Sequence, residues 1–302
     1  MQRQQIGIKM NRHRYSIRRG VFIGALLAWP LIQLAIFYFY VNFESFFLAF
    51  RSVDTELNTI WVGFSNFKTV WQDITKPGSV ILLGLRNGII LWVAQFLIHT
   101  PSSLLFAFMI YKKYRGTNLF RVLVLLPSII SGMLVALMFK MFIINLPKLI
   151  PSMPDIYNDR PFFTCLFYSV WMGLAGNVIV YPNVMNGTDP SIRESARLEG
   201  ASSLQEFWYI VLPLVMPTFT TFTVTSVATL FMGSGPQFLF WGYNAPDEVM
   251  NLNYWIFTKS TQENAALEYG YNSALSLLLT LITIPVTFGV KAIMEKADPM
   301  ND

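Results

Sequence analysis

The sequence contains few charged residues and few side chains that bind metals. Only 13% of its 302 residues are Asp, Glu, Lys or Arg, whereas 54% are hydrophobic. Soluble domains usually carry about 25% charged residues, so this composition excludes an ordinary soluble domain and indicates a membrane protein with several spans. The single cysteine, Cys165, excludes an intramolecular disulfide and a cysteine-rich metal site, and two histidines are too few for a catalytic zinc.

The sequence also lacks the motifs of common catalytic and nucleotide-binding sites. It has no Gly-x-x-x-x-Gly-Lys-Ser/Thr phosphate loop, no His-Glu-x-x-His pair, no serine nucleophile elbow and no paired carboxylates within its apolar runs. We therefore expect that the chain is not an enzyme, and that it carries no catalytic residue, metal or cofactor of its own.

Positive charge gathers beside the apolar runs. The net charge is +5, and residues 1–20 contain several Arg and Lys residues but no acidic one. Basic segments that flank a span stay in the cytoplasm, so topology explains this tail better than nucleic-acid binding does, and we expect no nucleic-acid partner. The first apolar run is too long for a cleaved signal peptide and has no Ala-x-Ala site.

Six apolar runs approach the roughly 20 helical residues that a bilayer requires. We expect an all-α, polytopic membrane protein with a basic cytoplasmic tail over 1–20, six transmembrane helices within 21–302, and both termini in the cytoplasm. The predicted spans cover about 21–41, 87–110, 119–144, 162–185, 217–232 and 269–290. The predicted outer loops cover about 42–86, 145–161 and 237–270, and a cytoplasmic loop covers about 186–216.

That cytoplasmic loop is polar, and prolines and glycines divide it into short segments. Asp189 and Pro190 predict the start of a helix, and Ser191 with Glu194 fits a capping box. Gly200 can end this helix.

Ser203 and Glu206 fit a second capping box, which opens a helix that runs to Pro213. Ala196, Gly200 and Ala201 leave part of the first helix almost without side chains, so another body can approach closely. The pattern predicts a helix, a glycine turn and a second helix.

The same loop resembles the "EAA" loop of binding-protein-dependent ABC importer permeases, in the form found in sugar permeases. The resemblance rests on Glu194-Ser195-Ala196, Glu199-Gly200-Ala201, Leu212-Pro213 and Pro217. The usual form is Glu-Ala-Ala, two residues, Asp-Gly-Ala, so Ser195 replaces an Ala and Glu199 replaces an Asp. Weaker similarities to sugar permeases lie at Trp61 to Trp71, Gly233 to Pro236 and Tyr269 to Ala274.

The resemblance implies a type I ABC importer permease and a set of partners. In that family the loop docks in a groove of an ATPase subunit, which implies coupling roles for Glu194, Ser195, Ala196, Glu199, Gly200 and Ala201. The implied partners are an ATPase dimer that binds ATP and Mg, a second and different permease subunit, an extracytoplasmic solute-binding protein, and a sugar or oligosaccharide. A homodimer of permeases remains an alternative, and the location is the cell membrane of a bacterium or archaeon.

The implied mechanism is alternating access, with residues 190–213 moving as the ATPases close. Sugars are recognised by aromatic faces and hydrogen-bonding groups, which favours residues on the fourth and fifth runs and just beyond. The candidate pathway residues are Tyr168, Trp171, Asn177, Thr225 and Gln237. The run 217–232 is also rich in threonines, which hydrogen-bond across helices or line a polar pathway.

Lys140 is a charged residue within the third predicted span. A charge at the bilayer centre costs about 2.5–3.5 kcal/mol on insertion scales, so we expect this side chain to extend towards the outer surface. There Lys140 and Arg160 leave open a basic lining for an acidic saccharide.

His99 supports a competing hypothesis, because an ionisable residue inside a span is a functional candidate. It lies close to Gln95 and Pro101. Pro101 leaves a backbone carbonyl without a donor, and the side chain of His99 or Gln95 can hydrogen-bond to that carbonyl. Alternatively, His99 relays protons in a secondary carrier that needs no ATPase. A third hypothesis is a membrane scaffold that transports nothing and whose cytoplasmic loop only binds a soluble partner.

Overall fold

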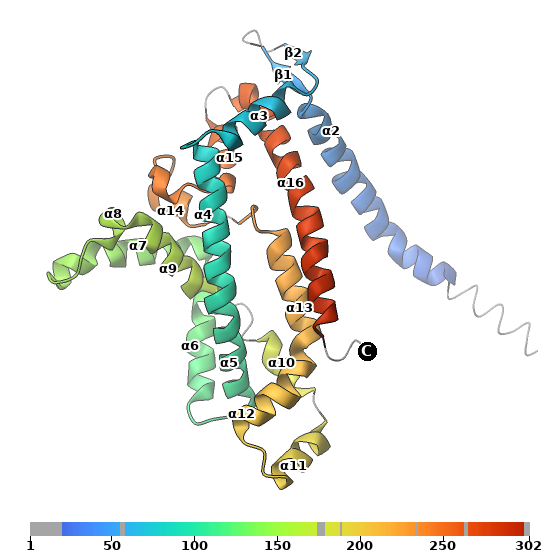
Figure 1. Cartoon of the computed structure of the whole chain (residues 1–302), viewed down its shortest axis with the longest axis vertical. Helices are drawn as coiled ribbons and strands as arrows, with labels where there is room; N and C mark the ends of the chain where they lie inside the picture. The colour runs from blue at the N-terminus through green and yellow to red at the C-terminus, as the bar shows by residue number, and fades with distance from the viewer. Residues whose placement is uncertain are drawn as a thin grey trace, which may run out of the picture. The chain divides into compact units, whose positions relative to one another are not determined.

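The computed structural model describes residues 20–54, 58–173, 179–187, 189–233, 235–262 and 265–298. The regular secondary structure of this part is helical except for one antiparallel hairpin of β1 (Arg51–Val53) and β2 (Thr59–Trp61). The basic tail predicted over 1–20 lies outside the described residues, apart from Gly20. Five described helices are long and apolar enough to cross a membrane, namely Gly20–Leu48, Val80–Tyr111, Gly132–Leu149, Ser203–Ala228 and Ala266–Lys296 (Figure 1).

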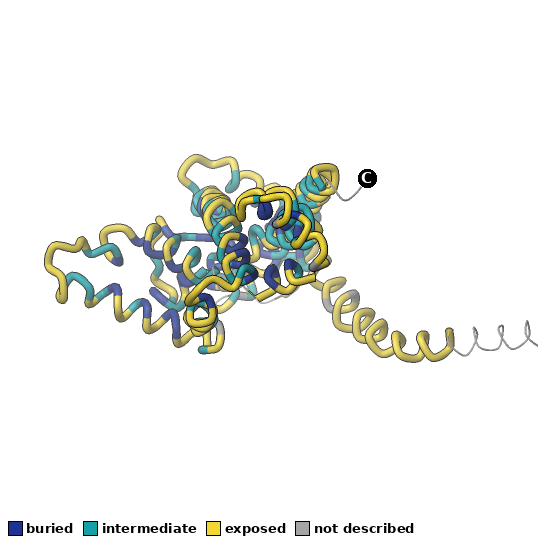
Figure 2. Tube along the Cα trace, turned by 90° about the horizontal axis from the view of Figure 1, so that it is seen from below, coloured by how far each residue is buried: buried dark blue, intermediate teal, exposed yellow. Residues whose placement is uncertain are grey.

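The chain divides into two compact units. The first comprises Met1–Phe67 with Ala266–Leu277, and the second comprises Lys68–Ala265 with Leu278–Asp302. In the first unit the helix Gly20–Leu48 includes η1 (Leu34–Tyr40) and α2 (Val41–Leu48). Its large apolar side chains are exposed along most of its length (Figure 2), as expected for a helix that contacts lipid or another chain.

The hairpin of the first unit is fixed by α3 (Ser65–Thr75). The Asn66 side-chain amide donates to the Ala49 and Arg51 carbonyls, at 2.9 and 2.8 Å. The Phe50 ring stacks on Trp61 with 5.7 Å between centroids. A Cβ at Gly270 would overlap the Arg51 carbonyl oxygen, so the start of α16 (Ala265–Lys296) can approach the hairpin only without a side chain.

In the second unit, one long helix is built from α4 (Val80–Ala94), η2 (Gln95–His99) and α5 (Thr100–Tyr111). Ser79 caps it, since its hydroxyl accepts from the Leu82 amide at 3.1 Å. Pro101 has no N–H to give to the carbonyl four residues earlier, and the helix widens into the π-helical turn η2 just before it.

A second helix repeats this arrangement. It consists of α12 (Ser203–Glu206), η3 (Phe207–Val211) and α13 (Leu212–Ala228). Here the Leu212 amide donates to the Phe207 carbonyl, five residues earlier, and Pro213 follows. Each wide turn therefore ends two residues before a proline.

The third predicted span is not one helix. The run 119–144 is divided between α6 (Thr117–Ile129) and α7 (Gly132–Leu149), because Ile130 is extended. Pro127 removes a backbone donor near this break, and hydropathy alone does not report such a bend. The fourth predicted run contains α9 (Pro161–Gly173) and α10 (Val180–Asn186).

The remaining helices of the second unit are short, apart from the part of α16 that it includes. They are α8 (Ile156–Asp159), α11 (Pro190–Leu198), α14 (Gln237–Trp241), η4 (Asp247–Val249) and α15 (Leu252–Thr261). Two buried clusters form its core. One gathers where α5, α10, η3 and α13 meet, and comprises Leu104, Ala107, Phe108, Tyr111, Tyr181, Met185, Phe207, Val211 and Val215. The other comprises Ala136, Phe139, Ile143, Tyr157, Cys165, Tyr168, Phe240 and Val249.

Lys140 binds a carbonyl in the segment predicted as the outer loop 237–270. Its ammonium group donates to the Phe240 carbonyl and lies 5.9 Å from the Tyr157 ring centroid. The Tyr157 hydroxyl donates to the same carbonyl at 2.8 Å. A cation at the C-terminal end of α14 satisfies a carbonyl that the helix leaves free, which explains this bond.

Candidate coupling loop and substrate pathway

The first helix of the loop at 186–216, α11, begins at the predicted place. The Asp189 carboxylate accepts from the Ser191 amide at 2.9 Å, and this bond lowers the pKa of Asp189. Pro190 occupies the first helical position, so the cap is Asp189 and the capping box predicted for Ser191 with Glu194 is wrong.

The end of α11 is also at the predicted place. Gly200 has φ +80°, a conformation that suits glycine, and the Ala201 amide donates to the Ala196 carbonyl at 2.9 Å. Together these features form a Schellman turn, which satisfies a carbonyl at the helix end.

The surface of α11 is mostly exposed. Of the predicted coupling residues, Glu194, Ser195, Glu199 and Gly200 are exposed, Ala201 is half-buried and Ala196 is buried.

Two apolar side chains on this helix were not singled out from the sequence. Ile192 is 50% exposed and Leu198 is 90% exposed. They lie six residues apart, about 120° from each other around the helix, so the sequence pattern does not place them on one face.

The second helix of the loop starts one residue earlier than predicted. Ser202 and Gln205 form the capping box. The Ser202 amide donates to the Gln205 side-chain oxygen at 2.8 Å, and the Gln205 amide donates to the Ser202 hydroxyl at 3.3 Å. The box predicted for Ser203 with Glu206 is therefore wrong by one position. This register leaves the Glu206 carboxylate free to point inward, where it is 2% exposed.

Glu206 forms an ion pair with Lys112, which follows the last residue of α5. Two neighbours of Lys112 contact the loop as well. The Tyr114 hydroxyl donates to the Ser203 hydroxyl at 3.3 Å, and the Arg193 guanidinium lies 5.5 Å from the Tyr111 ring centroid. Nothing in the local sequence of residues 111–116 indicates a contact so distant along the chain.

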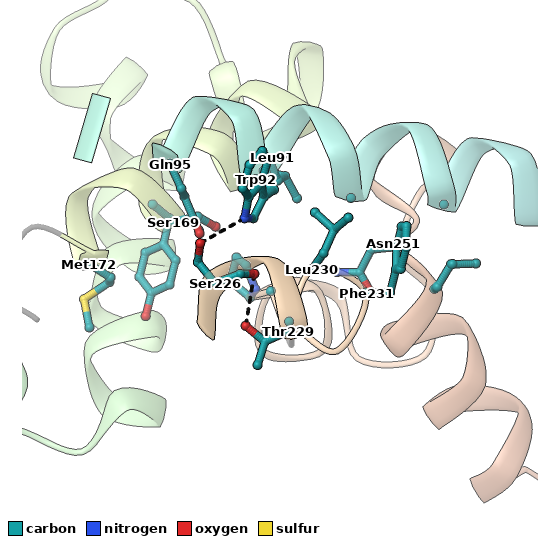
Figure 3. A pocket seen from close by; sticks show the side chains of 17 residues that line it. Leu91, Trp92, Gln95, Ser169, Met172, Ser226, Thr229, Leu230, Phe231 and Asn251 are labelled. Atoms are coloured by element: carbon teal, nitrogen blue, oxygen red, sulfur yellow. Dashed lines mark hydrogen bonds between the residues drawn. The ribbon is translucent and has the colours of Figure 1, made fainter. Parts of the chain in front are cut away.

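Three cavities follow one another along α13. The first has a volume of about 300 Å³ and is lined by polar and aromatic side chains that include Trp92, Gln95, Tyr168, Ser226 and Thr229 (Figure 3). The Trp92 indole donates to the Ser226 hydroxyl at 3.3 Å across this cavity's wall.

The second cavity, of about 230 Å³, shares Ser226 and Thr229 with the first and adds His99, Tyr181 and Thr225. The third, of about 470 Å³, shares Thr225 with the second and is also lined by Lys291 and Glu295. The threonine-rich run predicted to line a polar pathway thus borders all three cavities.

The predicted pathway residues fall in different places. Tyr168 lines the first cavity, and Thr225 lines the second and third. Trp171 lines a separate apolar groove together with Phe139. Gln237 is buried and donates to the Val249 carbonyl at 3.0 Å, and it lines none of the three cavities. Asn177 lies outside the described residues.

Two further lining residues, Trp92 and Gln95, were not proposed from the sequence as pathway residues, whereas Thr229 belongs to the predicted threonine-rich run. The Thr225 and Thr229 hydroxyls each donate to a carbonyl four residues earlier on α13, which leaves their oxygen lone pairs open to the cavities.

His99 lies in the wide turn η2, and its ring faces Gly173. A Cβ at Gly173 would stand 3.4 Å from two ring carbons. Nε2 of His99 and the hydroxyl of Tyr181 have no hydrogen-bond partner within the described chain. Among the described residues that line this cavity, Tyr181 is the only other ionisable one, so no carboxylate stands beside His99 to pass on a proton.

Comparison with known sequences identifies one family and several related transport proteins. Residues 81–300 match the family described as "Binding-protein-dependent transport system inner membrane component". The multiple sugar-binding transport system permease protein MsmF of Streptococcus mutans is 24% identical, over 84% of this chain and 88% of that protein. The arabinooligosaccharides transport system permease protein AraP of Halalkalibacterium halodurans is 22% identical, over 91% of this chain and 90% of that protein.

One solved structure extends the comparison to the fold. A chain from a bacterial ABC transporter involved in the import of the acidic polysaccharide alginate superposes with a TM-score of 0.73 and 19% identity. The superposition covers 94% of this chain and 99% of that one. The predicted fold class is therefore confirmed, although the described residues contain five clear spans where six were predicted.

Proposed function

The chain belongs to the family of binding-protein-dependent transport system inner membrane components, and on that premise we propose that it forms half of the membrane pathway of an ATP-driven sugar importer. The observation that carries the proposal is the loop at 189–213. This loop presents an exposed helix, α11, and its second half is packed into the end of a cavity-lining span. The chain has no phosphate loop, so a separate ATPase dimer binds ATP and Mg and hydrolyses the ATP.

In this proposal α11 is the element that docks on the ATPase. Leu198 and Ile192 provide apolar anchors, Glu194 and Glu199 provide a polar rim, and Gly200 lets the two backbones approach. Closure of the ATPases moves the loop, and the spans respond by exposing the cavities to one side of the membrane and then to the other.

The first two cavities along α13 favour a neutral, hydroxyl-rich substrate. Among the described residues that line the first two cavities there is no Lys, Arg, Asp or Glu. Indole and phenol rings next to hydroxyl groups suit the apolar faces and the hydroxyls of a sugar. The basic lining proposed for an acidic saccharide loses support, because Lys140 is bound to the Phe240 carbonyl.

The remaining partners follow from the same proposal. A second permease subunit completes the pathway, and an extracytoplasmic binding protein delivers the sugar or oligosaccharide. Both termini lie in the cytoplasm, and the complex resides in a bacterial or archaeal cell membrane. The names of the relatives MsmF and AraP support the class of substrate, and the name of a second solved neighbour supports the binding protein.

The test is purification of the tagged chain from its native membrane, with identification of co-purified proteins and an ATPase assay. We expect a second permease and an ATPase with the wild-type chain, and loss of the ATPase with Leu198→Asp. Leu204→Asp is the matched control, since Leu204 is also exposed but lies on α12, outside the docking helix. Recovery of the chain alone would overturn the proposal.

His99→Ala distinguishes the importer from a proton-driven carrier. In the importer, uptake by this variant still requires ATP and the binding protein, even if it is slower. Uptake that follows a proton gradient, needs no ATPase and is abolished by His99→Ala would establish the carrier instead. Absence of uptake by any route, with a soluble partner still bound, would favour the scaffold.

A further inference from the structure

The end of α5 is an ordered turn that carries a strained residue. Lys113 has φ 55°, and it is the only non-glycine residue with positive φ in the part of the chain that the structure describes. The Lys113 amide donates to the Ile110 carbonyl at 3.1 Å, and the Tyr114 amide donates towards the Met109 carbonyl at 3.5 Å. These two bonds define a Schellman turn with lysine at the position usually taken by glycine. A strained, fixed backbone points to a positional role for the neighbouring side chains.

This turn contacts the coupling loop at three points. Tyr111 lies under Arg193 of α11, Lys112 pairs with Glu206 at the end of α12, and Tyr114 bonds Ser203 at its start. The turn is therefore in contact with both helices of the loop at once.

The contacts differ in burial, and the ion pair is more enclosed than the bond from Tyr114 to Ser203. The Lys112 and Glu206 side chains are 11% and 3% exposed, whereas Tyr114 is 45% exposed. Phe108 and Phe207 pack 5.0 Å apart next to the pair, and the Lys112 ammonium lies 5.8 Å from the Phe108 ring. Little water reaches this site, so the attraction between the two charges is weakly screened.

A second ion pair on this chain shows the contrast. Lys291 and Glu295 lie one turn apart on α16 at 3.6 Å, and each side chain is about half exposed. Exposed pairs of this kind hold their partners loosely. The pair of Lys112 and Glu206 instead joins two elements that are 94 residues apart in the sequence.

We propose that Lys112 and Glu206 are positioning residues that transmit movement of the coupling loop to the span Val80–Tyr111. This proposal rests on the proposed importer function. When α11 is displaced by the ATPase, the buried pair obliges the end of α5 to move with the loop. The same span carries Trp92 and His99 into the first two cavities, so the displacement reaches the substrate pathway.

The test uses the complete importer, reconstituted in proteoliposomes with its second permease, ATPase and binding protein. Sugar uptake and ATP hydrolysis are measured together for Lys112→Glu, for Glu206→Lys and for the double variant that exchanges the two charges. We expect each single change to lower the uptake per ATP hydrolysed by roughly 10-fold, an order of magnitude taken from coupling free energies between binding sites. The ATPase should still co-purify, because α11 is unchanged, and the exchanged pair should recover most of the coupling.

Lys113→Asn is the matched control. It removes a positive charge from the same turn, asparagine tolerates positive φ, and Lys113 is exposed, so coupling should stay at the wild-type level.

Three results would overturn the inference. They are full coupling in both single variants, loss of ATPase binding together with uptake in those variants, or failure of the exchanged pair to recover. A wild-type complex without ATP-driven uptake would instead overturn the proposed function, and with it this inference.

Discussion

The two halves of the proposed coupling loop, residues 189–213, differ in how much of their surface is buried against the rest of the chain. The first half, α11, exposes most of its surface and leaves Leu198 at 90% exposure. The second half, α12 with η3, buries Glu206, Phe207 and Val211 against the end of α5 and its neighbours. A surface left open suits a partner that binds and releases, whereas a buried surface suits a fixed connection within the chain. Under the proposed function, the loop combines a docking helix with an anchoring helix, and the following changes test that division.

The largest expected effect is on the anchoring side, from Lys112→Met. This change leaves the Glu206 carboxylate buried without its partner, which typically costs about 3–5 kcal/mol. We expect a clear fall in the melting temperature of the purified chain in detergent. The double variant Lys112→Met/Glu206→Leu should recover most of it, because both charges are then absent. A single variant as stable as the wild type would show that the pair does not anchor the loop.

The next effect is from Val211→Ala, also on the anchoring side. Val211 is fully buried, and loss of two methyl groups costs about 2 kcal/mol once the remaining cavity is included. Leu198→Ala on the docking helix is the counterpart, and should change stability by less than ~0.5 kcal/mol. Thermal unfolding of both variants checks the comparison, and equal losses would remove the distinction between the two halves.

A smaller effect is expected at the turn that separates the halves. Gly200→Ala places a Cβ on a residue with φ +80°, which costs about 1–2 kcal/mol although the surrounding space is open. Lys113→Gly should have the opposite sign, because it relieves a positive φ of 55°. Melting temperatures that move in the same direction in both variants would contradict this account.

The smallest effect is the pH response of the cap on α11. The pKa of Asp189 is lowered by the bond from the Ser191 amide, so the ionised cap stabilises the helix fully above the unfolded pKa of about 3.9. That stabilisation is lost as the pH falls through the lower pKa of the folded chain. Hydrogen exchange at Ser191, corrected for its intrinsic pH dependence, should show loss of protection at acidic pH. Asp189→Asn, whose side chain does not ionise, should show no such loss.

Local chemistry explains which parts of the loop were predictable. The start at Asp189-Pro190 and the end at Gly200 depend on neighbouring residues, and both were predicted correctly. The second capping box was wrong by one position, because Ser202 and Ser203 are equally suitable and only packing decides between them.

Contacts between distant residues were not predictable. The pair of Lys112 with Glu206, and the bond from Lys140 to Phe240, each join residues about a hundred positions apart. The break after α6 was also missed, since hydropathy alone does not mark a bend, although Pro127 lies just before it. The prediction for the threonines of α13 was correct in part. Their density indicated polar surroundings, but the cavities that they line could be located only in the structure.

The wide turns η2 and η3 give the two cavity-lining helices a capacity for twisting. Each turn accommodates an i to i+5 hydrogen-bond pattern just before a proline, and so holds more residues than an ordinary turn. If such a turn shifts by one position along a helix, the residue that it passes rotates by about 100° around the axis. The backbone exchanges hydrogen bonds as this happens and does not lose them. The helices that carry Trp92, His99 and Thr225 can thus turn different side chains towards the pathway without unfolding.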